Sequence, residues 1–477
     1  MRENHASSRN ISLIARVVIL WCIIVLCTMN GIGQSRYVIV DSIIIQGNKH
    51  TKNHIIFNEI DFHPGDTISL EKLPSRLQQN ERRLRSISLF NLVTLNIKNW
   101  NTETSHCNLV VAVQENWFIY PYLIFELADR NFNVWRKEFN YALSRTNYGI
   151  ALNHINLTGN KDKLKLKVQG GYIRKLEMLY DYPYLWGKWG LTGNILYSES
   201  REVAYQTLEN KPVFYKNAQN ERIFRQYRGS LALQQRINPQ TIQSISLEYN
   251  DLKVDNEIVR LNPNFLGRGE SQLRYFILDY SLKYDNTVYP LYPLKGYRAE
   301  FNLRKEGFGW PDKITNTWLA MNIEQHFALA KNLILSAKIK FKINIESNKI
   351  PYMLNDAIGY KDDNITGYQL YVIDGRHFML VRHALKYRLL EHNFKISDKM
   401  PKPFRVMNTQ LFARLNLDAG YANDPSGGTN NPYTNRIQLG YGPGLDLILF
   451  NNFTASMELG ITRHGEAGIF FSGGLNF

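Results

Sequence analysis

Cysteine is scarce in this sequence, with three residues among 477, and their spacing matches no zinc-binding pair. Such scarcity excludes a disulfide-stapled fold. After the N-terminus no run of about 18 apolar residues occurs, which excludes a bundle of membrane-spanning helices. The sequence also lacks a serine nucleophile elbow, a phosphate-binding loop and a zinc-protease helix. We therefore expect no enzyme activity, no cofactor and no bound metal.

Acidic residues are outnumbered, with 42 Asp and Glu against 57 Lys and Arg, for a formal net charge of +15. Positive charge alone would favour a nucleic-acid partner, but residues 1–33 have the pattern of a secretory signal peptide. Basic residues precede the apolar run Val17–Met29, and the small residues Gly31 and Gly33 follow it. A retained membrane anchor is the alternative, although the run is short for about 30 Å of hydrocarbon. Because the chain is expected to be exported, we predict no nucleic-acid partner.

Residues 36–116 predict a small α+β module. The pattern changes from β-branched runs to helical spacing and back, in the order strand, helix, helix, strand, strand. The expected elements are a strand Tyr37–Gln46, a helix capped by Thr51, a helix from Leu73 to Ile87, and strands Leu92–Ile97 and Leu109–Val113. About eighty residues in this order can cover one face of a sheet with two helices.

Residues 118–477 show a different pattern, the alternation of apolar and polar residues. In one run Leu335 to Ile343 supplies the apolar positions, and Lys338, Lys340 and Lys342 lie between them. Each such run places one face in an apolar medium and the other in a polar one. A soluble sandwich would share this pattern. Runs long enough for the ~9–11 residues of a tilted spanning strand, with aromatic residues at their ends, favour a transmembrane β-barrel whose lumen the three lysines face.

The chain ends in an amphipathic strand. Phe471, Leu475 and Phe477 lie on one face of it, and the last residue is aromatic. A barrel closes on its last strand, and a terminal aromatic is part of the signal that the insertion machinery of Gram-negative bacteria reads. We therefore expect the barrel in the outer membrane and the N-terminal module in the periplasm.

The module resembles a known family in four short motifs taken in order. They are Ile44–Asn48, Phe62–Asp66, Leu89–Val93 and Val111–Glu115, which match "I-x-x-x-G-N", "F-x-x-G-D", "L-F-x-x-V" and "V-x-V-x-E". Together they resemble the POTRA domain of the BamA-type outer-membrane assembly proteins, also called the bacterial surface antigen superfamily. The resemblance implies a single POTRA-like domain followed by a barrel of about 16 antiparallel strands.

The barrel region is similar to the same family at a loop and at the strand that receives it. Ile365, Thr366, Gly367 and Tyr368 stand at the family's "V-R-G-F/Y" tip of an inward-folded loop, and Asp418 and Gly420 fall in its "F-x-D-x-G" strand. In the family the Arg of the tip bonds to that strand. Thr366 lacks the charged fork that would engage Asp418, so a weaker loop lock is expected. Arg376, eight residues past the tip, is a candidate substitute.

The family's mechanism implies a weak seam between the first and last strands. Gly473 and Gly474 reduce packing in the last strand and would favour a bend that opens the seam; barrel curvature is the alternative. A client strand could then add to the exposed edge by main-chain pairing. The module offers a second edge, in Leu92–Trp100 or Tyr37–Gln46, for periplasmic chaperones or accessory subunits.

The resemblance therefore implies a role in the assembly or insertion of outer-membrane proteins. A single module and Thr366 favour a specialised or accessory member. The expected partners are outer-membrane lipids and nascent outer-membrane or secreted proteins. A dedicated translocator for one secreted partner and a passive or structural pore are the alternatives.

Overall fold

The computed structural model describes residues 37–238, 240–287, 292–309, 313–346, 349–360, 363–397, 406–425, 430–450 and 453–475. The predicted signal peptide, residues 1–33, and the terminal Phe477 lie outside these ranges. The chain divides into two compact units, of which the first ends at Trp117 and the second begins at Phe118.

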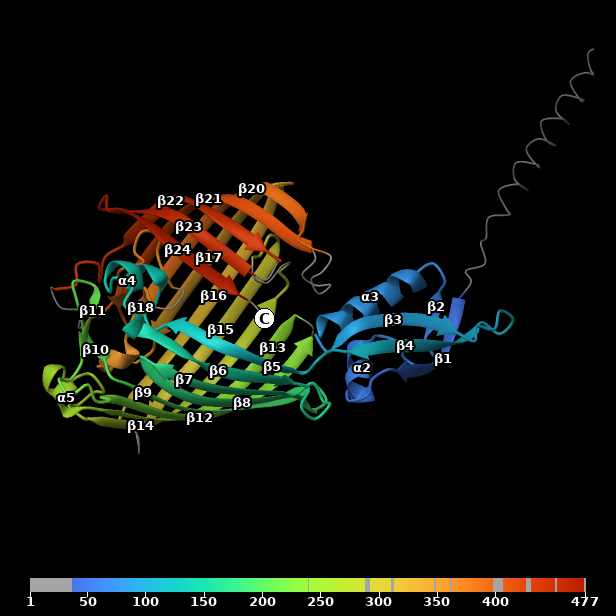
Figure 1. Cartoon of the computed structure of the whole chain (residues 1–477), viewed down its shortest axis with the longest axis horizontal. Coiled ribbons are helices and arrows are strands. Elements are labelled where there is room, and N and C mark those ends of the chain that lie inside the picture. The colour runs from blue at the N-terminus through green and yellow to red at the C-terminus, as the bar shows by residue number, and fades with distance from the viewer. Residues whose placement is uncertain are drawn as a thin grey trace, which may run out of the picture. The chain divides into compact units, whose positions relative to one another are not determined.

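The first unit is a four-stranded sheet with two helices (Figure 1). In the sheet order β2–β1–β4–β3, β1 and β4 are parallel and the other pairs are antiparallel. Its elements are β1 Tyr37–Gln46, α2 Asn53–Glu59, β2 Thr67–Ser69, α3 Leu73–Ser86, β3 Phe90–Lys98 and β4 His106–Glu115. The predicted α+β module is confirmed. The sequence pattern missed only β2, because three residues are too few to show a period.

The buried residues of the module come from its sheet and from both helices. Every second residue of β4 from Cys107 to Val113 is buried, at the period of two of a strand, and Val110 between them is buried too. The buried residues include Cys107, Leu109, Val111 and Val113 of β4, Ile55 and Ile56 of α2, and Leu73 and Leu84 of α3. Both helices therefore contribute to the buried interior of the module.

Glu115, the last residue of β4, ties the start of α2 to the sheet. Its carboxylate accepts hydrogen bonds from the Thr51 N–H at 2.6 Å and the His50 N–H at 3.1 Å. The prediction that Thr51 caps α2 is wrong: Lys52 holds the N-cap position, and Thr51 is buried. Partial burial raises the pKa of Glu115, but the hydrogen bonds from Thr51 and His50 outweigh it and bring the pKa below its ordinary value.

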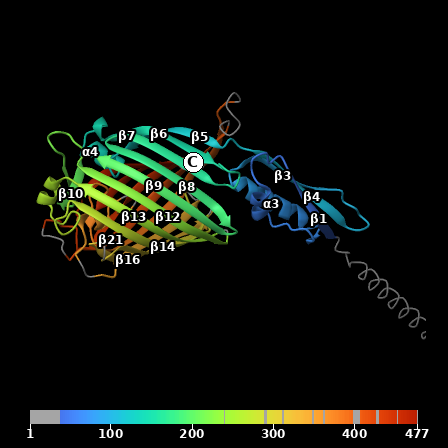
Figure 2. The same cartoon turned by 90° about the horizontal axis from the view of Figure 1, so that it is seen from below.

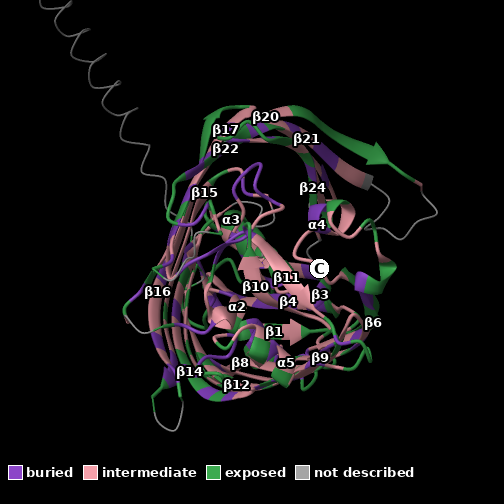
Figure 3. Ribbon diagram, turned by 90° about the vertical axis from the view of Figure 1, so that its left-hand side faces the viewer, coloured by how far each residue is buried: buried purple, intermediate pink, exposed green. Residues whose placement is uncertain are grey.

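The second unit is a 16-stranded antiparallel sheet in which neighbours in the chain are neighbours in space (Figure 2). The predicted barrel architecture is confirmed, and Figure 3 shows the strands as a ring. Its strands are β5 Ile119–Leu127, β6 Thr146–Ile155, β7 Lys163–Gly171, β8 Ile173–Trp186, β9 Trp189–Ser200, β12 Phe224–Asn238, β13 Thr241–Val254, β14 Gln272–Asp285, β15 Gly296–Phe308, β16 Thr315–Ala330, β17 Leu333–Asn344, β20 His377–Lys395, β21 Val406–Asn423, β22 Gln438–Leu449, β23 Phe453–Thr462 and β24 Ala467–Leu475.

Smaller elements lie in the connections of the barrel. They are α4 Phe132–Lys137, the 3-10 turns Leu143–Arg145 and Tyr352–Leu354, α5 Asn256–Leu261, and the strand pairs β10 Val203–Leu208 with β11 Lys211–Tyr215 and β18 Asp356–Ile358 with β19 Ile373–Asp374. Figure 1 places α4, α5, β10, β11 and β18 at one end of the barrel. Across the described ranges, every helix is too short or too polar to cross a membrane.

The alternation predicted from sequence appears as alternating exposure along the strands. In β21, Leu415 and Leu417 are 57% and 59% exposed, whereas Asn416 and Asp418 are 4% and 2% exposed. The apolar series therefore faces outward and the polar series faces the lumen. A one-residue slip would exchange the two faces along the whole strand.

We predict that Glu115→Gln destabilises the module at neutral pH. The folded-state pKa of Glu115 lies below its ordinary value of about 4.5, so the carboxylate stabilises the fold above that value, and this contribution is lost as the pH falls through the folded pKa. The variant should be about 1 kcal/mol less stable at pH 7 and should depend less on pH between roughly 3 and 5.

The buried thiol of Cys107 gives a readout for this module within the whole chain. Urea-dependent labelling with 4,4′-dithiodipyridine, which reacts with thiols in acid, measures its exposure. Glu103→Gln, at an exposed position in the turn between β3 and β4, is the control. Equal urea midpoints for the two variants at pH 7 would contradict the assigned role of Glu115.

Candidate functional site

The seam of the barrel lies between its first and last strands. The order of the sheet runs from β24 to β5, and among the described residues no hydrogen-bonded pairing joins these two strands. One side of β24 pairs with β23, from Leu475 opposite Phe453 to Ala467 opposite Ile461. Within the described ranges, β24 thus pairs with a strand on one side and with no strand on the other.

The two glycines of the predicted seam lie within this ladder. Gly473 is opposite Ala455 and Gly474 is opposite Thr454, and the pairing of β23 with β24 continues through both without a register shift. Phe471, also predicted at the seam, is an exposed residue of the same strand, and Leu475 is the last residue of β24.

The segment between β18 and β19 folds against the inner faces of β20 to β23; we call its residues 356–374 the inward loop. Its tip is the predicted motif of Ile365, Thr366, Gly367 and Tyr368, of which Ile365, Thr366 and Tyr368 are buried. Ile365 and Tyr368 join a buried apolar cluster with Phe378 and Leu380 of β20. The tip is therefore part of the packed interior of the barrel.

Thr366 binds Asp418 in a way that differs from the sequence interpretation. Both the N–H and the hydroxyl of Thr366 donate to Asp418 Oδ2 at 2.9 Å, and both residues are buried. The cation comes from the strand opposite, where Arg382 Nε lies 3.4 Å from the same oxygen. At this tip without Arg, a backbone N–H and a short hydroxyl reach the carboxylate directly.

Three glycines on adjacent strands form the surface on which the tip lies; we call Gly420, Gly440 and Gly460 the glycine seat. A Cβ atom at Gly440 would lie 1.8 Å from the Thr366 carbonyl oxygen, and one at Gly460 would lie 2.5 Å from the Gly367 nitrogen. At Gly420 it would lie 2.3 Å from the Ile365 side chain. Sequence reasoning found Gly420 but missed the other two. The signal was present, since glycine inside a strand indicates close approach of another backbone.

Polar contacts continue past the tip. The Tyr368 hydroxyl donates to Gln438 Oε1 at 3.1 Å, and the Gln369 side chain donates to Glu458. Glu458 also accepts from Arg414 and Asn416 of β21, each at 2.9 Å. The inward loop is therefore bonded to β21, β22 and β23 together.

The predicted lysine face contacts the inward loop. Lys340 Nζ lies 2.6 Å from Asp363 Oδ2, and Lys342 Nζ donates to the Asp356 carbonyl at 2.6 Å. Lys338 lies directly opposite Glu324 of β16. Two of the three lysines therefore hold the loop, and the third stands beside a carboxylate of the neighbouring strand.

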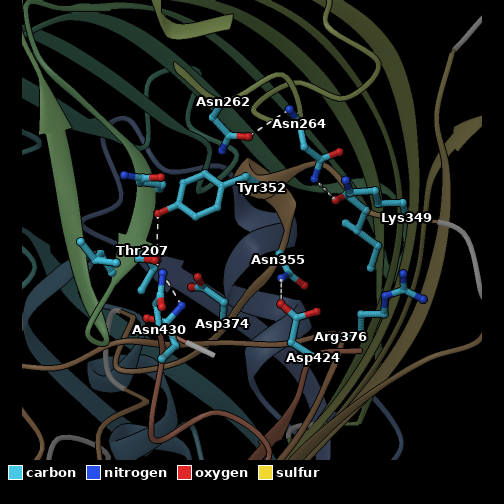
Figure 4. Close-up of a pocket in the computed structure, with 14 residues that line it drawn as sticks. Thr207, Asn262, Asn264, Lys349, Tyr352, Asn355, Asp374, Arg376, Asp424 and Asn430 are labelled. Atoms are coloured by element: carbon cyan, nitrogen blue, oxygen red, sulfur yellow. Dashed lines mark hydrogen bonds between the residues drawn. The ribbon is translucent and has the colours of Figure 1, made fainter. Parts of the chain in front are cut away.

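Arg376, the candidate substitute for the missing Arg, is found at another place. It lines a cavity of about 300 Å³ with Asp374, Asp424, Tyr352 and Thr207 (Figure 4). Within this cavity the Tyr352 and Thr207 hydroxyls lie 3.0 Å apart, and Asn355 donates to Asp424 at 3.0 Å. The cavity is thus lined both by the β10–β11 hairpin, through Thr207, and by Asp374, the last residue of the inward loop.

A second inward segment follows β14. The Tyr292 hydroxyl donates to the buried Asp446 at 2.6 Å, and its ring packs on Phe412 with centroids 5.0 Å apart. Lys386 Nζ lies 4.2 Å from the centre of the Tyr292 ring. The lumen faces of β20, β21 and β22 are therefore covered here as well as at the inward loop.

Sequence reasoning missed α4 altogether. This helix of six residues follows β5 and contacts β24 through Asn133 and Arg136. The only local signal is Asn131, whose side chain accepts from the Val134 N–H at 2.9 Å and caps the helix. A helix this short shows no period that could reveal its apolar face.

Comparisons with known proteins agree with this architecture. Residues 38–116 match the POTRA family, described as a surface antigen variable number repeat. The crystal structure of BamA from Haemophilus ducreyi lacking POTRA domains 1–3 matches with a TM-score of 0.60 at 14% identity, covering 92% of this chain and 84% of that one. CdiB from Acinetobacter baumannii matches with a TM-score of 0.49 at 14% identity, over 92% and 73% of the two chains. No curated protein sequence matches the chain. One POTRA-like domain followed by a barrel with the BamA fold is thus confirmed.

We predict that Thr366→Val loosens the inward loop. The change removes one of two hydrogen bonds that Thr366 donates to a buried carboxylate, at a cost of about 1–3 kcal/mol. Amide exchange of residues 363–370 in the intact chain in lipid nanodiscs should accelerate about tenfold or more. Thr366→Ser keeps the hydroxyl and is the matched control. Equal protection in the Val and Ser variants would show that the hydroxyl does not hold the loop.

Gly440→Ala should displace the tip more strongly. The added methyl group would meet the Thr366 carbonyl at 1.8 Å, and neither group can turn away because each is attached directly to the backbone. Protease cleavage within the inward loop should increase several-fold while the barrel still inserts. Gly229→Ala in β12, where a Cβ meets nothing within 4 Å, is the control. If Gly440→Ala left the protease cleavage of the inward loop unchanged, the role assigned to the glycine seat would be wrong.

Proposed function

We propose that this protein is an outer-membrane barrel that assists the assembly or insertion of other outer-membrane proteins, as a specialised or accessory member of its kind. The observation that carries the proposal is the seam, where β5 and β24 remain without a mutual ladder in the described residues. A strand with an unpaired side is a template for another strand. A client can add to it through main-chain hydrogen bonds, which make little demand on its sequence.

The outward faces of the strands support a location in a membrane. Outward residues such as Leu415, Leu417 and Leu439 are large, apolar and exposed. Facing water they would remain without a partner, whereas hydrocarbon accepts them at no cost. Exposed Trp186 and Trp189 flank the turn between β8 and β9, a position typical of the interface with lipid head groups. The partners we propose for this face are outer-membrane lipids.

The segments that fill the lumen favour the transfer of a client at the seam over the passage of a client through the barrel. The inward loop is bonded to β17 and to β21, β22 and β23, and Tyr292 packs on the same side of the lumen. A secreted chain passing through would first have to break these contacts. Strand addition at the seam needs none of them to break.

The periplasmic module supplies a second docking edge in this proposal. β3 is the outermost strand of its sheet, beside β4. Its outward Leu95 N–H and Val93 carbonyl bond to Glu81 and Arg85 of α3, at 3.0 and 2.9 Å. A chaperone or accessory subunit that pairs with β3 would replace these two side chains. The work proposed for both edges is binding, without a catalytic step.

The outer-membrane proteome of cells depleted of this protein tests the proposal. We expect a restricted set of barrel proteins to fall several-fold, with recovery on expression of the wild-type chain. Expression of Glu103→Gln is the control for complementation. Loss confined to one secreted protein would instead identify a dedicated translocator, and an unchanged proteome would identify a passive or structural barrel.

A further inference from the structure

The open side of β24 is occupied by side chains of α4. Asn133 Nδ2 donates to the Phe471 carbonyl at 3.1 Å, and the Phe471 N–H donates to Asn133 Oδ1 at 2.9 Å. Two residues earlier in the strand, the Ile469 carbonyl accepts from Arg136 Nη2 at 2.8 Å. Asn133 is 2% exposed, so this contact lies away from water.

These bonds reproduce what a neighbouring strand would supply. In an antiparallel pair, a residue exchanges both its N–H and its carbonyl with the residue opposite, and the next such pair lies two residues on. The side-chain amide of Asn carries the same donor and acceptor as a peptide group. Asn133 therefore takes the place of a partner residue at Phe471, and Arg136 supplies the donor that a partner N–H would give to the Ile469 carbonyl.

The side chain of Phe471 packs against the same helix. The Phe132 and Phe471 rings meet edge to face with centroids 6.1 Å apart, and the Arg136 guanidinium lies 5.3 Å from the Phe471 ring. Phe132, Asn133 and Arg136 are spaced to share one side of a helix. Figure 3 shows α4 beside β24.

The inward loop holds the segment that leads into α4. Asn131 Nδ2 donates to the Gln369 carbonyl at 2.7 Å, and the Arg130 guanidinium donates to the Leu370 carbonyl. Asn131 also caps α4. The residues that follow the tip on the glycine seat thus fix the start of the helix.

We propose that α4 is a displaceable guard of the β24 edge, held in place by the inward loop. Asn133 and Arg136 occupy the backbone positions at Phe471 and Ile469 that an incoming polypeptide strand would take, so a client strand gains this part of the edge only when α4 leaves. The partner is a β-strand with an apolar residue able to replace Phe132 against Phe471. This inference rests on the proposed function and adds its regulation.

Amide exchange measures the guard directly. The full chain in lipid nanodiscs is compared with Asn133→Ala/Arg136→Ala, and exchange is followed in residues 467–475. We expect the double variant to exchange about tenfold faster at Phe471, because its N–H loses the only acceptor found for it on the open side within the described residues. Asn133→Asp, which keeps the size and the acceptor, should retain more protection than the double variant.

The matched control is Glu138→Gln. It breaks the 2.8 Å ion pair between Lys211 and Glu138, which follows the last residue of α4, and it leaves the contacts with β24 in place. Exchange at Phe471 should stay at the wild-type rate in this variant. An unchanged exchange rate at Phe471 in the double variant, or an equally large increase in the control, would overturn the proposal that α4 guards the β24 edge.

Client access is then measured with a photoreactive benzoylphenylalanine in place of Ser472, combined with each variant. The probe is a urea-denatured, fluorescently labelled outer-membrane barrel protein from the same cells, diluted onto the nanodiscs. We expect several-fold more adduct with the double variant than with the wild type or Glu138→Gln.

The two readouts separate the two proposals. Equal adduct in all variants, with faster exchange only in the double variant, overturns the guard and leaves the proposed function standing. Faster exchange without adduct in any variant overturns the proposed function and, with it, the regulatory role of α4.

Discussion

The backbone of a strand edge has to find hydrogen-bond partners, and much of this barrel follows from that constraint. In hydrocarbon an unpaired N–H or carbonyl costs several kcal/mol, so spanning sheets normally close on themselves. Here the first and last strands are not paired in the described residues, and side chains complete part of the edge instead. Hydrogen bonds from side chains satisfy the N–H and carbonyl groups of this edge. They also leave these groups free to change partners one at a time, which a continuous strand ladder would not.

The same use of polar groups explains why the inward loop stays docked without an arginine at its tip. Asp418 is nearly inaccessible to water, and a buried carboxylate needs donors more than it needs one particular residue type. The N–H of position 366 is available whatever side chain stands there, and the nearby cation belongs to the barrel wall at Arg382. Close approach on the glycine seat makes these short bonds geometrically accessible.

Local patterns predicted the fold better than they predicted the site. Alternation identified the barrel strands and their faces because it repeats over neighbouring residues. The placement of Thr366 near Asp418 followed from the resemblance to a known family. The hydrogen bonds between Thr366 and Asp418 were not predicted, since residue type says nothing about a backbone donor. Gly440 and Gly460 and the contact of Asn133 with Phe471 depend on which segments meet in space. A glycine inside a strand indicates that another backbone comes close, but it does not say which segment, and no pattern in the chain pairs Asn133 with Phe471.

The contact between Asn133 and Phe471 joins residues 338 apart in the chain. Closing so long a loop is entropically costly and comes late in folding, after the intervening strands have paired. α4 is synthesised long before β24, the strand that it contacts. Among the described residues, the two ends of the barrel chain meet through this side-chain contact and not through a ladder between β5 and β24, so the contact can form only once the last strand is present.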